Sequence, residues 1–364
     1  DINDEFVNDK SEDKNWRVVT PEVALEMGAI GYVFGSQVQR ALQIPIGIID
    51  NSRGGASLES LVPRHMFAKH PDAAARTRAA EGLGVPVHDS LAALLAGLDL
   101  LSIAAPTPAH HDLARASLGR GIATLVEKPM AATPEEWEGI LALARAQGVA
   151  LAVGQIERMN PAVRAALPHL RQPRFIEAHR LAPPVPRGTD VDVILDLMIH
   201  DLDLALLATR SRVADVQAVG VPVVTPRVDI ANARITFESG CVANITASRI
   251  SREKVRKIRF FEASEYLSID CLNRTVEAFE LEPAGPENPD AHWLARIRPL
   301  AIAVSNEDPL ETELRHFVAL RADPARSWAE SETALEALRV ADRVRRQVEH
   351  RPVRSEPTGP SVPV

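Results

Sequence analysis

The spacing of hydrophobic residues along the chain changes near residue 154. Before this point, short apolar runs alternate with segments in which apolar residues recur every three or four positions. Short apolar runs are typical of buried strands, and the wider spacing is typical of amphipathic helices. Strands and helices in alternation predict a parallel sheet covered by helices, and ligands bind such sheets at the carboxyl ends of the strands.

The elements of this first part follow from the same pattern. The predicted strands cover residues 16–19, 44–50, 85–87, 98–104, 122–126 and 149–153. The predicted helices cover residues 72–80, 91–95 and 111–118, and two more begin after Thr20 and Thr133. Each of these two threonines precedes a proline, which suits the first position of a helix.

After residue 154, apolar and polar residues alternate with a period of two. The predicted strands cover residues 175–181, 213–224, 231–238, 241–248 and 257–262, and the predicted helices cover residues 192–208, 310–320 and 329–349. The alternation is typical of antiparallel strands with one exposed face. The sequence therefore predicts an α/β fold, in which a Rossmann-like parallel sheet is followed by a second α+β domain with a large, mostly antiparallel sheet.

Composition and charge narrow the class of protein. The 364 residues are 46 % hydrophobic and 25 % charged, and the formal net charge is −8 with the basic residues scattered, so we expect no nucleic-acid partner. The two cysteines, Cys241 and Cys271, lack metal-like spacing, which argues against a disulfide framework and a thiolate zinc site and favours a reducing compartment. No apolar run approaches the roughly 18 residues of a membrane span. We expect a cytoplasmic protein without a membrane partner, acting on a small molecule.

A charged pair follows one of the apolar strands. Glu127 and Lys128 come directly after residues 122–126, and Pro129 fixes the turn. Parallel sheets hold ligand groups at this position, and the Lys128 amine can donate a hydrogen bond to a sugar hydroxyl. The alternative interpretation is a solvated strand end.

A second polar group interrupts an otherwise buried helix. Asp196 and His200 lie four residues apart on one face, and Asp203 follows on the same helix. His200 can act as a general base for a hydroxyl proton, with Asp196 orienting its ring. Two alternatives remain open, namely a core histidine satisfied by Asp196 or Asp203, and a metal site built from two or three of these residues.

Further polar residues flank the predicted cleft. The loop after residues 98–104 contains Pro106, Thr107 and His110, which can contact a dinucleotide or form an ordinary loop. Arginines that could hold a phosphate or carboxylate of the substrate, unless they lie in surface loops, are Arg158, Arg180 and Arg187.

A group of glycines imitates a dinucleotide-binding loop. Gly28, Gly31 and Gly35 precede Asp50 at the end of a predicted strand. A phosphate loop should leave a strand directly, however, and Gly28 follows a helix-like segment. We interpret these glycines as sites where a helix packs closely on a sheet.

From residue 72 to residue 349 the chain resembles the Gfo/Idh/MocA oxidoreductase family. The resemblance rests on Ala105-Pro106-Thr107, Glu127-Lys128-Pro129, the Gly154–Pro161 stretch and the Asp196–Asp203 stretch. It implies oxidation of a hydroxyl by NAD or NADP. The residues it implies for catalysis are Lys128, Asp196 and His200, those for cofactor binding are Pro106, Thr107, His110, Glu127, Lys128 and Gln155, and those for substrate binding are Arg158, Arg180, Arg187 and Asp203.

The segments at Arg187 and Asp196 are more similar to the bacterial nucleotide-sugar branch of this family. The resemblance therefore implies a sugar or nucleotide-sugar substrate. It also implies a homo-oligomer formed through the antiparallel sheet.

Residues 1–71 instead resemble part of a sialate O-acetylesterase of the SGNH hydrolase type, through Trp16–Glu22, Gly31–Gly35 and Ile44–Gly55. The nucleophile and the Asp-His pair of that family have no counterpart here, so esterase activity is not expected. The glycine-rich loop of the oxidoreductase family is also missing, which leaves a non-catalytic chimeric remnant as an alternative to the enzyme. The predicted segments are residues 1–71, a partial dinucleotide-binding domain at 72–153, a substrate and dimerisation domain at 154–350, and a disordered tail at 351–364.

Overall fold

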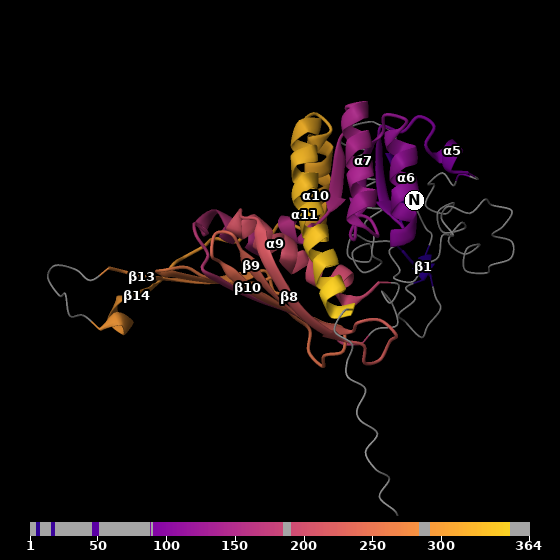
Figure 1. Ribbon diagram of the computed structural model, residues 1–364. Helices are drawn as coiled ribbons and strands as arrows, with labels where there is room; N and C mark the ends of the chain where they lie inside the picture. The colour runs from indigo at the N-terminus through magenta and orange to yellow at the C-terminus, as the bar shows by residue number, and fades with distance from the viewer. Residues whose placement is uncertain are drawn as a thin grey trace, which may run out of the picture. The chain divides into compact units, whose positions relative to one another are not determined.

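The computed structural model describes residues 5–7, 16–18, 46–50, 88, 90–184, 191–283 and 292–349. The chain forms two compact units (Figure 1). The first unit contains residues 1–161 and 306–335, and the second contains residues 162–305 and 336–364. The helix and strand predicted at residues 72–87, the glycines Gly28, Gly31 and Gly35, and the tail at 351–364 lie outside the described residues.

A parallel sheet forms the centre of the first unit. Its strand order is β3-β4-β5-β6, where β3 is Ile46–Asp50, β4 is Leu100–Ala104, β5 is Ala123–Glu127 and β6 is Leu151–Gly154. All three pairings are parallel, which confirms the predicted sheet. The predicted strand at residues 16–19 is present as β2 (Trp16–Val18), but it pairs with β1 (Glu5–Val7) in a separate antiparallel sheet.

Three helices of the first unit begin at the signals in the sequence. These helices are α5 (Leu91–Leu94), α6 (Thr107–Leu118) and α7 (Pro134–Gln147). The Thr133 hydroxyl caps α7 by accepting a hydrogen bond from the Glu136 amide at 3.3 Å, and Gly148 ends the helix with a φ of 67°. Helix α6 begins four residues earlier than the predicted His111, because the early Pro108 suits a first helical turn.

Two helices from the end of the chain complete the first unit. They are α10 (Pro309–Leu320) and the first part of α11 (Pro324–Glu349). The Ser331 hydroxyl donates to the Leu151 carbonyl at 2.8 Å, and the Ser327 hydroxyl accepts from the Leu151 amide at 3.1 Å. These bonds fix α11 to the strand β6, a long-range pairing that the hydrophobic pattern did not predict.

A large sheet forms the second unit (Figure 1), with the strand order β14-β13-β12-β11-β7-β10-β9-β8. All neighbouring strands are antiparallel except β7 and β10, which confirms the predicted mixed sheet. The predicted strands are observed as β7 (Phe175–Leu181), β8 (Val213–Val221), β9 (Ile230–Phe237), β10 (Val242–Ser248) and β11 (Val255–Phe261). Three strands were not predicted, namely β12 (Glu265–Asp270), β13 (Thr275–Leu281) and β14 (Ile297–Pro299).

The predicted helix at residues 192–208 has two parts. The π-helical turn η4 (Ile194–Met198) continues into α9 (Ile199–Thr209), and the Ile199 amide donates to the Ile194 carbonyl. Helix α9 packs on the strands β7 and β10. The shorter helical segments are η2 (Ile156–Met159), α8 (Pro161–Ala166), η3 (Leu167–His169) and η5 (Trp293–Arg296).

Candidate active site

The carboxyl ends of β5 and β6 meet at one edge of the parallel sheet. Glu127, the last residue of β5, is paired in register with Gly154, the last residue of β6. A Cβ atom placed on Gly154 would lie 2.8 Å from the Glu127 Cδ atom. The Glu127 carboxyl group therefore packs against the Gly154 backbone. Lys128 is the next residue, and the peptide bond between Lys128 and Pro129 is cis.

His110 joins the two loops that carry most of the predicted cofactor residues. Its Nδ1 atom lies 2.9 Å from the Pro129 carbonyl, and its Nε2 atom lies 2.6 Å from the Ala105 carbonyl. Carbonyl oxygens only accept, so both hydrogen bonds form when both ring nitrogens carry a proton. Thr107 is buried at the first position of α6. The structure thus brings His110 and the loops of Pro106 and Lys128 together.

Gln155 follows β6 at the same edge. Its side chain is only 1 % exposed, and neither its amide oxygen nor its amide nitrogen has a hydrogen-bond partner among the described residues. A buried amide requires hydrogen-bond partners, because burying a polar group without one is costly. A dinucleotide fits this requirement, since its carboxamide and ribose hydroxyls both donate and accept hydrogen bonds.

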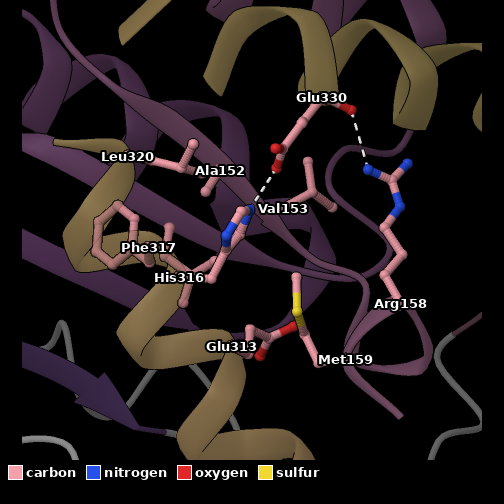
Figure 2. A pocket seen from close by; sticks show the side chains of 10 residues that line it. Ala152, Val153, Arg158, Met159, Glu313, His316, Phe317, Leu320 and Glu330 are labelled. Atoms are coloured by element: carbon pink, nitrogen blue, oxygen red, sulfur yellow. Dashed lines mark hydrogen bonds and ion pairs between the residues drawn. The ribbon is translucent and has the colours of Figure 1, made fainter. Parts of the chain in front are cut away.

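A pocket lies beside this edge within the first unit (Figure 2). It is lined by Leu125, Ala152, Val153, Arg158, Met159, Glu313, His316, Phe317, Leu320 and Glu330. The Arg158 Nη1 atom donates to the Glu330 carbonyl at 3.1 Å. Burial raises the pKa of the Glu330 carboxyl, but the hydrogen bonds and charges of His316 and Arg326 lower it further than burial raises it. The predicted substrate residue Arg158 therefore lies in a charged pocket.

The second unit carries the other predicted catalytic residues. Asp196 lies half-buried in the π-helical turn, whereas His200 and Asp203 lie buried on α9. π-helical turns are rare and are frequently found at functional sites. The hydrophobic spacing could not predict this turn, because a single inserted residue hardly changes that spacing.

Arg180, which was predicted to bind substrate, forms a buried ion pair within the second unit. Its Nε and Nη2 atoms donate to the two carboxylate oxygens of Asp201 at 2.9 and 2.8 Å. Both side chains are buried, and the ion pair joins β7 to α9. A role of Arg180 in holding substrate stays a prediction, and Arg187 lies outside the described residues.

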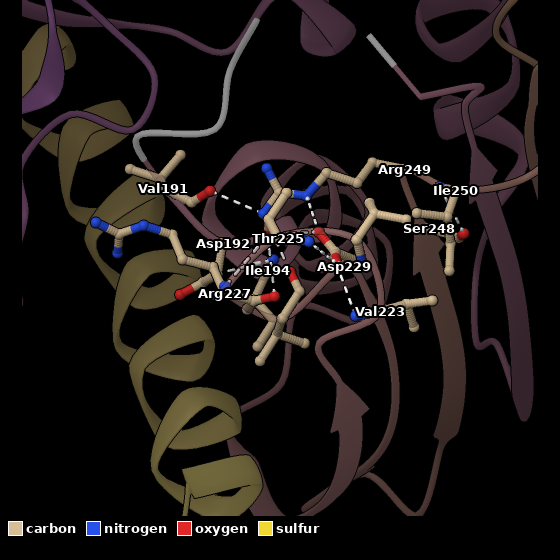
Figure 3. Close-up of polar contacts among 12 residues, drawn as sticks. Val191, Asp192, Ile194, Val223, Thr225, Arg227, Asp229, Ser248, Arg249 and Ile250 are labelled. Atoms are coloured by element: carbon tan, nitrogen blue, oxygen red, sulfur yellow. Dashed lines mark hydrogen bonds and ion pairs between the residues drawn. The ribbon is translucent and has the colours of Figure 1, made fainter. Parts of the chain in front are cut away.

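A polar network surrounds the beginning of the helix that carries Asp196 and His200 (Figure 3). The Asp229 carboxylate accepts hydrogen bonds from the amides of Val223, Val224 and Thr225 at 2.8, 2.7 and 2.9 Å, and from the Thr225 hydroxyl at 2.7 Å. Burial raises the pKa of Asp229, but these hydrogen bonds outweigh it and lower the pKa to about 2. Arg249 lies against the same carboxylate, with its Nε atom 3.2 Å from Oδ1.

The network ends at the residues that precede the π-helical turn. The Arg249 Nη2 atom donates to the Val191 carbonyl at 2.9 Å. Asp192 caps the turn by accepting from the amides of Ile194 and Leu195, and its other oxygen accepts from Arg345 Nε at 2.7 Å. These residues fix the position where the Asp196 turn begins. Sequence reasoning could have found Asp192 as a helix cap, whereas Asp229 and Arg249 gave no local signal.

Two negative findings apply to the part of the chain that the structure describes. None of its helices is both long enough and apolar enough to cross a membrane. No group of histidine, cysteine and acidic side chains in this part could hold a metal ion.

The parallel sheet, with polar residues at the carboxyl ends of its strands, has the architecture of oxidoreductases with an NAD-binding Rossmann fold. The family model of that description matches residues 56–155, and a model of the GFO/IDH/MocA C-terminal domain matches residues 168–262. UDP-N-acetylglucosamine 3-dehydrogenase from Acidithiobacillus ferrooxidans is 40% identical over 234 residues, which cover 63% of this chain and 72% of that protein. The chain belongs to the Gfo/Idh/MocA family.

A solved structure and one further relative agree with this assignment. A solved structure of the same Acidithiobacillus ferrooxidans dehydrogenase has a TM-score of 0.71 at 32% identity, covering 84% of this chain and 97% of that one. Myo-inositol dehydrogenase Hyg17 from Streptomyces leeuwenhoekii is 29% identical over 53% of this chain and 64% of that protein.

Proposed function

We propose that this protein is an NAD(P)-dependent dehydrogenase that oxidises a hydroxyl group of a nucleotide sugar. The observation that carries the proposal is the edge of the parallel sheet. Lys128 follows β5 there, and Gln155, whose side-chain amide has no hydrogen-bond partner among the described residues, follows β6. The 40% identity with a UDP-N-acetylglucosamine 3-dehydrogenase supports this substrate class.

Each predicted catalytic residue has a separate task in this proposal. The Lys128 amine donates a hydrogen bond to the reacting oxygen, and the His200 imidazole accepts the hydroxyl proton. Asp196 orients the imidazole from the preceding turn of the same helix. Removal of the proton by His200 increases the electron density on the hydroxyl oxygen, which favours loss of hydride from its carbon.

NAD or NADP, when bound, supplies the acceptor for that hydride. The residues that would hold it are Pro106, Thr107, His110, Glu127, Lys128 and Gln155. The hydrogen bonds of His110 support this assignment, because they hold the loops of Pro106 and Lys128 against each other. Arg158, Arg180, Arg187 and Asp203 are proposed as substrate ligands, with arginine suited to the diphosphate of a nucleotide sugar.

The experiment that tests the proposal uses the purified full chain. Calorimetry measures NAD and NADP binding, and the absorbance of the reduced nicotinamide measures turnover of UDP-N-acetylglucosamine and related nucleotide sugars. We expect Lys128→Met to abolish turnover while the protein stays folded, and Lys254→Met, at an exposed lysine, to leave it unchanged. Equal turnover in wild type and Lys128→Met would remove Lys128 from the mechanism.

The same measurements separate the alternatives. A folded protein that binds neither dinucleotide is the non-catalytic remnant, and release of acetate from an acetylated sugar would support the esterase. Most residues of the esterase resemblance lie outside the described part of the chain. The residues that follow β3, where a phosphate-binding loop could lie, are also outside it.

We also propose a homo-oligomer formed through the antiparallel sheet. A row of aromatic rings crosses the strands β7, β11, β12 and β13, with centroid distances of 5.7, 5.1 and 6.3 Å. The row consists of Phe175, Phe261, Tyr266 and Phe279, and Phe279 is 41% exposed. Sedimentation of wild type and Phe279→Glu tests it, and equal masses for both would argue against a contact at this row.

A further inference from the structure

Glu313 is a buried acid without a hydrogen-bond partner in the described part of the chain. It lies on α10, its side chain is 3% exposed, and neither carboxyl oxygen is hydrogen bonded. The neighbouring Glu311 differs, because its carboxylate accepts from Arg315 at the surface. Figure 2 shows Glu313 lining the pocket next to Met159. A charged carboxylate in such a place is unfavourable unless other groups compensate for it.

The charged groups around Glu313 come from each element that packs on it. Glu127 approaches from β5, Arg158 from η2, His316 from α10 itself and Glu330 from α11. The His316 Nε2 atom lies 2.6 Å from a Glu330 carboxylate oxygen, so these two side chains are paired with each other. Burial and the charge of Glu127 raise the pKa of Glu313 well above its ordinary value, and Arg158 only partly opposes them.

Glu127 is the group through which Glu313 can affect the reaction. It immediately precedes Lys128, and its carboxyl group packs on Gly154 at the edge of the sheet. If both glutamates were charged, their repulsion would push Glu127 away from this position. With one proton on the pair, a single negative charge faces Arg158, and Glu127 can stay in place.

We propose that Glu313 is a positioning residue that holds Glu127, and through it Lys128, in place by remaining a neutral carboxylic acid. The inference rests on the proposed dehydrogenase function. It deepens that function by adding a group from α10, about 185 positions further along the chain than Lys128, to the site at the sheet edge. The group does not touch the reacting atoms.

The first test is the pH dependence of stability, which does not require activity. An acid whose pKa is raised in the folded state contributes its stability below its ordinary pKa of 4.5, and loses it as the pH rises towards the folded value. Glu313→Gln keeps the shape and the neutral charge but has no proton to lose. We therefore expect the melting temperature of Glu313→Gln, relative to wild type, to increase steadily as the pH rises above 4.5. A constant difference would overturn the proposal.

The second test measures function in the same variants, with Glu311→Gln as the matched control on the same helix. We expect dinucleotide binding and turnover of the wild type to weaken at alkaline pH, and this alkaline fall to shift to higher pH or vanish in Glu313→Gln but not in Glu311→Gln. An identical fall in all three proteins would overturn the positioning role.

The two proposals fail in different ways. If the wild type shows no turnover with any sugar but its dinucleotide binding has the Glu313-dependent alkaline fall, the substrate proposal fails and the positioning role stands. If turnover is present and its pH profile is unchanged in Glu313→Gln, the dehydrogenase stands and the positioning role fails.

Discussion

Arg180 on β7 and Asp201 on α9 form an ion pair with two parallel hydrogen bonds, and both side chains are withdrawn from solvent. Asp201 directly follows His200. The pair therefore connects the helix that carries the proposed base to the strand beneath it. Buried pairs of this kind specify a position more than they add stability, because both charges lose their hydration.

Breaking this pair from one side should destabilise the protein strongly. We expect Asp201→Asn to lower the free energy of unfolding by roughly 3–5 kcal/mol, because it leaves the buried Arg180 charge without its counter-ion. Urea denaturation followed by circular dichroism measures the loss.

The exposed pair of Glu311 and Arg315 provides the control for this measurement. Its removal by Glu311→Gln should cost less than about 1 kcal/mol, since water screens the charges. A similar loss in both variants would contradict the buried ion pair as the cause.

Asp229 should give the second unit a distinct sensitivity to acid. Its pKa of about 2 lies below the ordinary value of 3.8, so its contribution to stability is present above pH 3.8 and is lost as the pH falls towards 2. We expect Asp229→Asn to be less stable than wild type at neutral pH, with the difference shrinking on acidification. Melting curves in buffers of decreasing pH provide the measurement, and a difference that stays constant would argue against an ionised Asp229.

Cys241 should be unreactive in the folded protein. Burial raises the pKa of its thiol from the ordinary value of 9.0 to about 11, and thiolate is the reactive form. We expect alkylation by iodoacetamide at neutral pH to be slow in native protein and fast after unfolding. Mass spectrometry of the peptide containing Cys241 shows the difference, and rapid native labelling would mean that strand β10 opens readily.

The sequence predicted those elements whose hydrophobic period is regular. Strand β7 has the predicted bounds, because its inward residues alternate strictly with outward ones. Strands β12 and β13 were missed because acidic residues such as Glu265 and Glu277 weaken the apolar signal of their exposed face. The apolar alternation is therefore too weak in these two strands for them to be recognised from the sequence.

The candidate site also contains residues that the sequence predicts and residues that it does not. Lys128 was predicted as a site residue because it follows an apolar strand, and Gln155 was predicted through the family resemblance. Glu313 was missed, since one acidic residue on an amphipathic helix looks like a surface residue until the packing of the helix is known. The ion pair of Arg180 could not be predicted either, because its sequence setting gives no sign of the partner on α9. Contacts between residues far apart in the chain determine both cases.

A single added methyl group should test the position of Glu127. An alanine Cβ at residue 154 would lie 2.8 Å from the Glu127 carboxyl, so the carboxyl must move. Glu127 ends in a flexible side chain, which can shift without unfolding the sheet. We expect Gly154→Ala to weaken dinucleotide binding and turnover several-fold while the melting temperature changes little.

Gly139 on the exposed side of α7 is the matched control, because a Cβ placed there meets nothing within 4 Å. Gly139→Ala should leave binding and turnover unchanged, and it should raise stability by up to about 1 kcal/mol since alanine favours a helix more than glycine. Calorimetry, turnover and thermal melting compare the two variants directly. If Gly154→Ala binds the dinucleotide as well as Gly139→Ala does, the placement of Glu127 against Gly154 is not needed for cofactor binding, and Lys128 must be held by other contacts.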